Sequence, residues 1–376
     1  MEGQKDLMNI NNYIERKGHL TFEQMKFNEL DSLILSELSY MNLDLVAPSI
    51  HNPKAKKPHI KDLDLTHLSA ISYGSVDNKR NEKMLKLMME SKRFQDIKVC
   101  YTHRIFDEKN YNQFFAVTFI FPNGDAYLSF RGTDITMVGW KEDFLMTFKP
   151  LVLSQKESME YFKCVIKHIK GNFYLGGHSK GGNLAMYVAL NIDEQYEDRL
   201  IKAYSFDGPG FKEDIINHDT LERIEHKLVK YMTYNDVIGV VFNKHKKPHI
   251  VESNGVLLGG HDPFYWQVNI KTHSFKKKRD RSAISKKSEV GFNNWMNSIS
   301  NEDRELAFDV LFRLFKEVKT VYDLISIGVP AIITKRNKIV KEYPKDEQKR
   351  IKMILDKLIK SFMKALTTPL KSLTQK

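Results

Sequence analysis

The spacing of apolar residues changes along the chain, and each change predicts a different element. Apolar residues at helical spacing predict an amphipathic helix over residues 22 to 40 and another near residues 83 to 94. Residues 113 to 121 and 126 to 130 are aromatic and β-branched runs, and the Pro-Asn-Gly-Asp sequence between them predicts a β-hairpin turn. We therefore expect helices first and the start of a sheet after them.

From residue 155 onward, predicted strands and helices alternate. The helices cover residues 155 to 169, 181 to 190 and pieces of 211 to 226, and the strands cover residues 172 to 175, 201 to 206 and 228 to 233. Alternation at this spacing implies right-handed crossovers between neighbouring strands. We therefore expect an α/β fold with a mostly parallel central sheet flanked by helices.

The chain changes character again after residue 270. Residues 276 to 287 form a basic run that is typical of an exposed linker, and Ser300 with Asp303 has the spacing of a helix-capping box. Another predicted helix begins near Pro344, with apolar residues on one face and lysines opposite. The predicted parts are a domain over residues 1–270 that includes N-terminal helices, a basic linker over 271–290 and a basic helical C-terminal extension over 291–376.

The formal net charge of +12 comes entirely from the C-terminal part. Residues 271–376 hold 25 Lys and Arg against 12 Asp and Glu, whereas the rest of the chain holds 34 against 35. The basic tail has three interpretations. It is a helical subdomain with solvated lysines, or it contacts an anionic membrane surface, or it binds nucleic acid. We do not expect nucleic acid, because no recognition motif accompanies the charge.

Cysteine content and hydropathy indicate the compartment. Cys100 and Cys164 are too few for a disulfide framework, and both lie in apolar stretches where buried, reduced thiols are expected. Residues 1 to 20 lack the apolar run of a secretory signal. The apolar segment 321 to 333 is interrupted by Asp and Pro and is shorter than the roughly 20 residues of a spanning helix. We therefore expect a cytoplasmic protein that can lie peripherally at a membrane.

A G-x-S-x-G pattern lies within residues 176 to 183, between a predicted strand and a predicted helix. At such a turn the serine backbone is strained, and Gly177 and Gly181 avoid collisions with the neighbouring strand and helix. Ser179 is therefore the candidate nucleophile, and the N–H of Lys180 can stabilise an oxyanion at the helix start. A phosphate-binding turn is the alternative, but no G-K-[ST] or G-x-G-x-x-G pattern supports it.

This pattern, with Phe-Arg-Gly-Thr at residues 130 to 133 and the downstream Trp140 and Asp143, resembles the class 3, fungal-type lipase branch of the α/β-hydrolases. More narrowly, the G-H-S-K-G-G sequence and the Asn-Glu-Leu-Asp and Ser-Tyr sequences at residues 28 to 31 and 39 to 40 resemble a family of microbial proteins in that superfamily. The resemblance covers about residues 25 to 270 and implies an α/β-hydrolase fold and a serine hydrolase.

The resemblance also implies roles for residues of the Phe-Arg-Gly-Thr sequence. It implies that Thr133 is the second oxyanion donor, through its backbone N–H and its hydroxyl. Without the resemblance, a strand-end turn in which Thr133 caps a backbone group fits equally well. We interpret Arg131 as structural, paired with a carboxylate such as Asp143.

A serine nucleophile needs a histidine to take its proton and a carboxylate to orient that histidine. In this fold the chain order is serine, acid, histidine, and both Asp207 and Asp236 follow predicted strands. The resemblance aligns the Asn-Asp-Val sequence with the lipase acid, so we prefer Asp236. Asp207 stays as a pocket residue or the alternative acid.

Several histidines compete for the role of the base. His178 directly precedes the serine and is expected to pack or bond locally, and His245 and His249 lie in a loop expected to be exposed. His261 follows two glycines and precedes an aromatic segment, and it has the required place in the chain order, so we select it as the base. His261 itself is part of no H-x-x-x-H or C-x-x-C sequence, so we expect no metal and no cofactor.

The predicted reaction is hydrolysis of a carboxyl ester in a small molecule or a lipid, and the chemistry does not fix the acyl group. The aromatic residues at 114 to 115 and 264 to 266 suit an apolar acyl chain or an ordinary core. Two alternatives stay open: a non-catalytic binding module of the α/β-hydrolase type, and an acyltransferase that uses the same triad.

Overall fold

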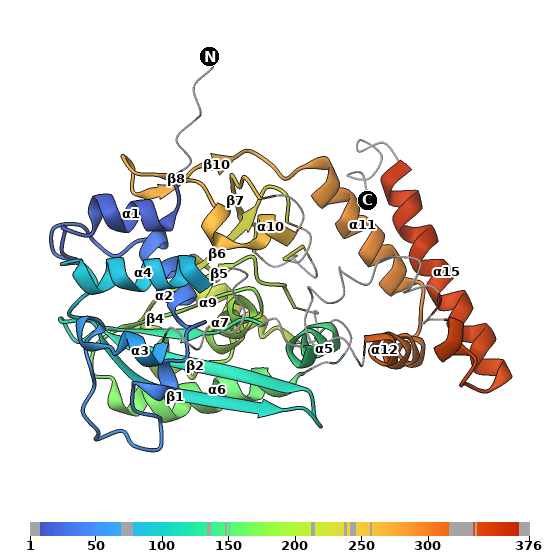
Figure 1. The fold of residues 1–376 in the computed structure, drawn as a ribbon, viewed down its shortest axis with the longest axis horizontal. Coiled ribbons are helices and arrows are strands. Elements are labelled where there is room, and N and C mark those ends of the chain that lie inside the picture. Colours follow the sequence, from blue (N-terminus) through green and yellow to red (C-terminus); the bar gives the residue numbers. More distant parts are fainter. Residues whose placement is uncertain are drawn as a thin grey trace, which may run out of the picture.

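The computed structural model describes residues 8–68, 78–133, 137–146, 149, 151–211, 215–236, 239–240, 246–255, 258–315, 334 and 337–367. Within these residues, eight strands form a central sheet in the order β1-β2-β3-β4-β5-β6-β7-β10 (Figure 1). The strands are β1 (Lys98–Asp107), β2 (Asn112–Ile120), β3 (Ala126–Phe130), β4 (Phe173–His178), β5 (Leu200–Phe206), β6 (Leu228–Thr233), β7 (His249–Val251) and β10 (Lys277–Lys278). Strands β3 to β7 are parallel, and antiparallel pairs close both edges.

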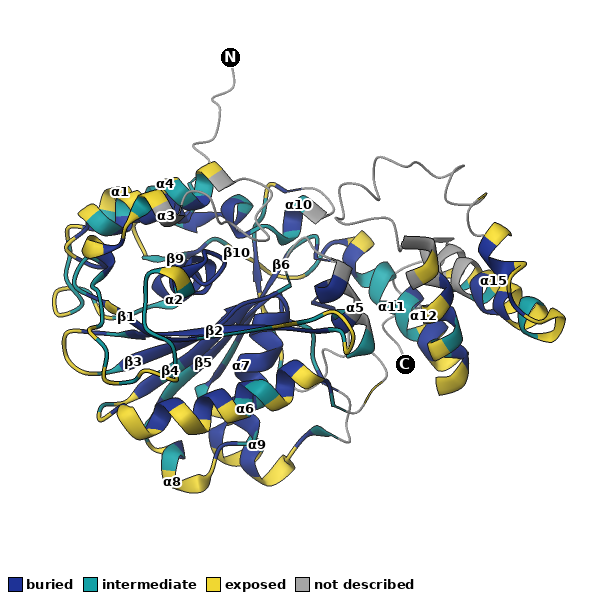
Figure 2. Ribbon diagram, turned by 60° about the horizontal axis from the view of Figure 1, so that its bottom comes forward, coloured by how far each residue is buried: buried dark blue, intermediate teal, exposed yellow. Residues whose placement is uncertain are grey.

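Helices cover both faces of the sheet (Figure 2). One layer holds α1 (Ile10–Lys17), α2 (Glu29–Leu38) and α4 (Asn78–Glu90), and the other holds α6 (Leu153–Val165), α7 (Lys180–Leu190) and α9 (His218–Ile224). Each layer buries its own apolar cluster against the sheet. This arrangement confirms the predicted fold of the α/β-hydrolase type.

Shorter elements complete the described chain. They are α3 (Leu65–Leu68), α5 (Met137–Leu145), α8 (Glu194–Glu197), α10 (Leu258–His261) and the two-stranded pair of β8 (Val268–Asn269) with β9 (Ser274–Phe275). The predicted hairpin is confirmed: β2 and β3 are antiparallel, and Gly124 in their turn has φ +89°, which glycine adopts without strain.

Two predictions about local structure were wrong in part, and two elements were not predicted. The opening helix starts at Glu29 rather than residue 22, because Asn28 caps it, and neither α1 nor β1 was predicted. Residues 276 to 287 are not a linker: Lys277 and Lys278 form β10, and α11 already begins at Ala283. Exposed lysines are typical of an edge strand, so this composition fitted a strand as well as a linker.

Two predictions about buried side chains are also resolved. Cys100 is buried as expected, but Cys164 on α6 is exposed. The aromatic residues Phe114, Phe115 and Trp266 are all fully buried in the two core clusters. These three side chains therefore belong to the core.

Three C-terminal helices lie beside the sheet as a group: α11 (Ala283–Asn297), α12 (Asn301–Phe315) and α15 (Lys345–Thr367) (Figure 1). Trp295 and Ile354 join α11 to α15, and Val310 and Ile351 join α12 to α15. The predicted helices in this region are confirmed, and Ile351, Ile354 and Leu355 of α15 are buried against its neighbours.

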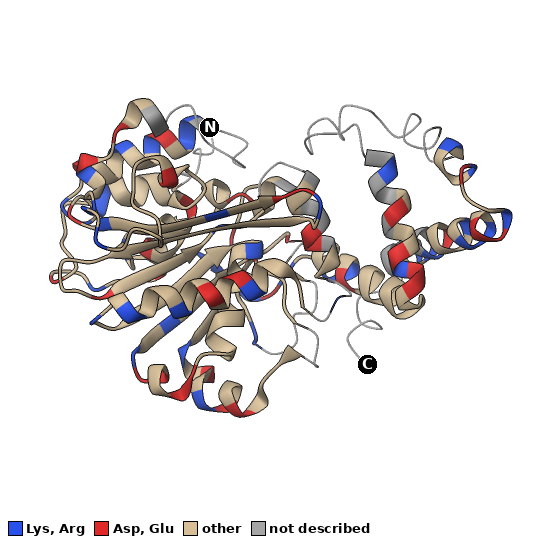
Figure 3. Cartoon of the chain, turned by 90° about the horizontal axis from the view of Figure 1, so that it is seen from below, with Lys and Arg blue, Asp and Glu red and all other residues tan. Residues whose placement is uncertain are grey.

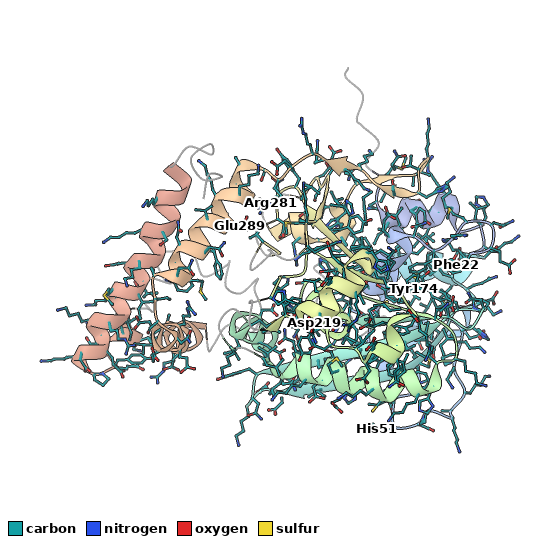
Figure 4. All side chains as sticks on the ribbon, turned by 180° about the vertical axis from the view of Figure 1, so that it is seen from behind. Phe22, His51, Tyr174, Asp219, Arg281 and Glu289 are labelled. Atoms are coloured by element: carbon teal, nitrogen blue, oxygen red, sulfur yellow. The ribbon has the colours of Figure 1, made fainter. Side chains whose placement is uncertain are left out.

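Basic and acidic residues are interspersed on this helix group (Figure 3). Lys352, Lys360 and Lys364 on α15 are exposed. At the other end of the group, Arg281 pairs with Glu289 where α11 leaves the sheet (Figure 4). Among the described residues, no helix combines the length and hydropathy needed to cross a membrane.

A buried ion pair anchors the start of α2. Arg93 donates from Nε and Nη2 to the two carboxylate oxygens of Asp31 at 2.7 and 2.5 Å, and both side chains are fully buried. Asp31 also accepts the N–H of Asn28, as part of the capping box. Further carbonyls accept the remaining guanidinium hydrogens: Leu20, Thr21, Met25 and Lys26. The Asn-Glu-Leu-Asp sequence is thus a structural element of this helix.

We predict that Arg93→Ala lowers the free energy of unfolding by about 3 kcal/mol or more, because it leaves the buried Asp31 carboxylate unpaired. Chemical denaturation followed by circular dichroism measures this loss. Lys61→Ala is the matched control, since its pair with Asp96 is exposed and should contribute less than about 1 kcal/mol. Equal effects of the two substitutions would contradict the prediction.

Candidate active site

Ser179 occupies the turn between β4 and α7, at the carboxyl edge of the sheet. Its backbone has φ +57° and ψ −129°, a conformation that is strained for any residue with a side chain. A Cβ at Gly181 would lie 1.9 Å from the carbonyl oxygen of Phe130 on β3, and one at Gly177 would lie 2.3 Å from the backbone of Gly181. The two glycines therefore permit the close approach of strand and helix that this turn requires.

The first turn of α7 surrounds this serine with backbone donors. The N–H groups of Gly182 and Asn183 donate to the carbonyl of Ser179 at 2.9 and 3.4 Å. The N–H of Lys180 is at the first position of the helix, where no carbonyl inside the helix can accept it. The helix dipole favours negative charge at the same place.

The loop after β3 lies against the serine from the other side. A Cβ at Gly132 would lie 3.1 Å from the Cβ of Ser179, so this loop and the serine turn are in direct contact. The next residue, Thr133, donates its hydroxyl to Asp143 at 2.5 Å. Burial raises the pKa of Asp143 to about 6, while the charge of Lys180 and the Thr133 hydroxyl oppose that rise. Asp143 thus holds the candidate oxyanion donor. The expected pairing of Arg131 with a carboxylate such as Asp143 stays a prediction.

A buried ion pair next to the Ser179 turn was not predicted from the sequence. The Nζ of Lys180 donates to Oε2 of Glu142 at 2.8 Å and to the carbonyl of Gln113 at 2.7 Å. Both charged side chains are almost fully buried. Glu142 also accepts the N–H groups of Gln113 and Ser154. Helix α5 therefore holds both candidate oxyanion donors, Lys180 through Glu142 and Thr133 through Asp143.

Two buried carboxylates flank His261. Its Nδ1 lies 3.3 Å from Oδ2 of Asp207 and 3.7 Å from Oδ1 of Asp236, distances of ion pairs rather than of well-aligned hydrogen bonds. Asp207 directly follows β5 at φ +49° and accepts the backbone N–H and hydroxyl of Thr233. The structure therefore brings both candidate acids to the candidate base, and Asp207 is the nearer one.

The electrostatics of the three groups are linked. Burial opposes the charged form of His261, but Asp207 and Asp236 together raise its pKa above the ordinary value. Burial and the charge of Asp236 raise the pKa of Asp207. Within the described residues, Nε2 of His261 has no hydrogen-bond partner, so this atom is not engaged by another group.

Of the other histidines, His178 belongs to this cluster and His249 does not. The Nε2 of His178 donates to the carbonyl of His261 at 2.9 Å, and the centroids of the two rings are 4.6 Å apart. His249 is exposed on β7, as expected, and His245 lies outside the described residues. The expectation that His178 bonds locally was wrong, because its partner is 83 residues away in the sequence.

Among the residues that the structure describes, His178, Asp207 and His261 are the side chains with a spacing that could hold a metal. Each offers one nitrogen or carboxylate oxygen, and these atoms lie within 4.8 Å of one another. However, Nε2 of His178 already bonds a carbonyl, which a metal would have to displace. The donor set is better suited to moving a proton between a histidine and a carboxylate.

Comparison with known proteins gives one family and several lipases. The model of the Mbeg1-like family matches residues 88–313. No curated protein matches the sequence. Similar solved structures include the M37 lipase (16% identity, TM-score 0.34, 58% of this chain and 71% of that one). They also include the Rhizomucor miehei lipase propeptide complex (16% identity, TM-score 0.33, 42% of this chain and 57% of that one). A third is Lip2 lipase from Yarrowia lipolytica (12% identity, TM-score 0.32, 49% of this chain and 70% of that one).

We predict that the pKa of His261 falls in both Asp207→Asn and Asp236→Asn, because each substitution removes a carboxylate that favours the charged ring. Asp236→Asn should have the larger effect, about one unit or more. Burial and the charge of Asp236 raise the pKa of Asp207 and so favour its neutral form, and replacement of a neutral carboxyl group removes less negative charge from the site. NMR titration of ring-labelled histidines measures this, with His261→Gln for assignment and the exposed Asp219→Asn as control. A larger fall in Asp207→Asn would identify Asp207 as the charged partner instead.

Proposed function

We propose that this chain, which belongs to the Mbeg1-like family, is a serine hydrolase that cleaves a carboxyl ester through an acyl-enzyme on Ser179. The observation that carries the proposal is the strained backbone of Ser179 at a strand-to-helix turn. The preceding residue, His178, contacts the half-buried His261, which has two carboxylates on its Nδ1 side. A strained residue persists where the surrounding structure fixes it, and such residues are concentrated at functional sites.

In the proposed reaction, Nε2 of His261 takes the proton of the Ser179 hydroxyl as the oxygen attacks the ester carbonyl. The carbonyl electrons move to the oxygen, and the backbone N–H groups of Lys180 and Thr133 stabilise that oxyanion, while the Thr133 hydroxyl stays bonded to Asp143. His261 then gives the proton to the departing alcohol. Water, deprotonated by His261, repeats the sequence on the acyl-enzyme and releases the acid.

We assign the charged orienting acid to Asp236 and a supporting role to Asp207. Two carboxylates so close to one imidazole cannot both be ionised cheaply, so one of them is expected to hold a proton. The raised pKa of Asp207 makes it the better proton holder. Asp207 then fixes the geometry through Thr233 while Asp236 supplies the negative charge that favours the imidazolium.

The proposed residues do not fix the acyl acceptor. Ser179, His261 and the oxyanion donors would act in the same way whether water or an alcohol attacks the acyl-enzyme, so an acyltransferase would use the same residues. Product formation that depends on an added alcohol or amine would identify transfer, and hydrolysis in its absence supports the hydrolase. A non-catalytic module would bind the ester without releasing any product.

We predict that a fluorophosphonate probe labels the wild-type protein and fails to label Ser179→Ala. Hydrolysis of a short p-nitrophenyl ester should fall by about 10⁴-fold or more in the same variant, since removal of a triad serine leaves only binding and oxyanion stabilisation. Ser298→Ala, a change at an exposed serine, should behave as wild type. A folded wild-type protein that resists labelling and hydrolyses no ester would overturn the proposed function.

For the basic tail, we propose contact with an anionic membrane surface through the exposed lysines of α15. Ile351, Ile354 and Leu355 of this helix are packed against α11 and α12, so the proposed contact is electrostatic and does not require insertion of these side chains. It would bring an ester hydrolase close to lipid substrates.

We predict that the protein sediments with phosphatidylserine-containing vesicles at low salt, that it dissociates as the salt concentration rises, and that it ignores neutral vesicles. Replacement of Lys352, Lys360 and Lys364 by Glu should abolish the sedimentation, because each lysine near an anionic surface contributes about 1 kcal/mol. Glu substitution of three exposed lysines on the opposite end of the molecule, Lys54, Lys56 and Lys61, is the control. Unchanged sedimentation of the α15 variant would refute the contact.

A further inference from the structure

The Ser-Tyr sequence at residues 39 to 40 has no role in the proposed reaction, yet Tyr40 is buried and contacts residues of the site. Its hydroxyl is 3.2 Å from Nδ1 of His178 and 3.4 Å from the His178 carbonyl. The backbone N–H of Gly132 bonds the same oxygen, and a Cβ at Gly132 would come within 2.1 Å of it. One tyrosine oxygen thus contacts both the residue before the nucleophile and the residue before Thr133.

We propose that Glu37, Tyr40 and His178 form a positioning cluster that holds the base His261 by its main-chain carbonyl. This inference rests on the proposed function, in which His261 takes the proton of Ser179. The three residues contact neither substrate nor the reacting atoms, so they are positioning residues. The cluster is carried by contacts between helix α2, the end of β4 and the segment around α10.

The direction of the hydrogen bonds fixes the state of His178. Its Nε2 faces the His261 carbonyl at 2.9 Å, and a carbonyl oxygen can only accept, so Nε2 must carry the hydrogen. In the neutral ring, Nδ1 is then an acceptor, and the Tyr40 hydroxyl is placed to donate to it. The hydroxyl of Tyr40 therefore selects the tautomer of His178 that can hold His261.

Burial keeps this cluster uncharged. Burial lowers the pKa of His178 well below its ordinary value, and the nearby charge of His261 lowers it further. Oε1 of Glu37 lies 3.4 Å from Nδ1 of His178, and burial followed by the charge of Asp262 raises the pKa of Glu37 well above its ordinary value. An uncharged His178 matters because its ring is 4.6 Å from that of His261, and a second positive charge there would oppose the imidazolium.

The position of His261 needs such a support. It ends the short helix α10, and a four-residue helix has little stability of its own. A small displacement of a general base from its nucleophile reduces the rate of the chemical step far more than it reduces substrate binding. The cluster should therefore affect kcat and leave KM nearly unchanged.

The test compares two substitutions at the same position. His178→Phe keeps a planar ring but cannot donate to the His261 carbonyl, and we expect kcat for a p-nitrophenyl ester to fall by about 10- to 100-fold with KM within about twofold. His178→Gln offers an amide donor near the position of Nε2, and we expect it to recover at least part of that loss. Thermal melting establishes that each variant is folded.

Tyr40→Phe tests the cluster without a change at the serine turn, in case His178→Phe does not fold. It removes the hydroxyl that selects the His178 tautomer and that also accepts the Gly132 N–H, and we expect a fall in kcat of the same kind but smaller size. Tyr204→Phe, which removes the hydroxyl of another buried tyrosine, should leave kcat unchanged.

The outcomes separate this inference from the proposed function. A wild-type protein that neither reacts with fluorophosphonate nor cleaves the ester refutes the function and the inference together. An active wild type with folded His178→Phe and Tyr40→Phe variants of full kcat refutes the cluster alone. A fall in kcat of His178→Phe that His178→Gln does not relieve also refutes it, because the role would then be packing of the ring rather than donation.

Discussion

The parallel pairing of β4, β5 and β6 is the constraint on which the site depends. Parallel strands end at the same edge of a sheet, so the residues that follow them are brought together whatever their separation in sequence. In this chain His178 pairs with Phe206, and Phe206 pairs with Tyr231, which places Ser179 and Asp207 directly past two neighbouring strand ends. A shift of one residue in either pairing would turn these side chains to the other face.

The same edge gathers charged groups in an environment that excludes water. Each of these groups has a partner of defined geometry: Lys180 has Glu142, Asp143 has Thr133, and Asp207 has Thr233. Dipoles and charges that are fixed before a reaction begins cost no reorganisation during it. The buried pair of Asp31 and Arg93 shows the same principle in a structural setting, where the charges only join helix α2 to the loop before β1.

The features that the sequence predicted correctly are those with a local physical cause. The hairpin follows from an Asn-Gly turn, and the turn at Ser179 follows from glycines that remove collisions over a few residues. The contact of His178 with His261 could not be predicted, because it depends on how two loops meet across 83 residues. The choice between Asp207 and Asp236 could not be made either, since both follow strands of the same parallel set.

Polar composition was misleading for a related reason. A basic run is compatible with a linker and with an edge strand, and only the free hydrogen-bonding edge of β7 decided that Lys277 and Lys278 form a strand. Glu142 was not predicted as a site residue, because its contact with the buried Nζ of Lys180 becomes evident only when the fold brings α5 next to the start of α7.

Helix α5 has one further consequence, through its last residue. Leu145 packs against the apolar cluster of the C-terminal helices, whereas Glu142 and Asp143 on the same helix face the serine turn. The charge distribution suggests an appendage that begins after residue 270, but the hydrophobic packing crosses that boundary. A shortened chain that ends there would uncover one side of the helix that supports the oxyanion donors, so the basic segment is part of the scaffold whatever else it touches.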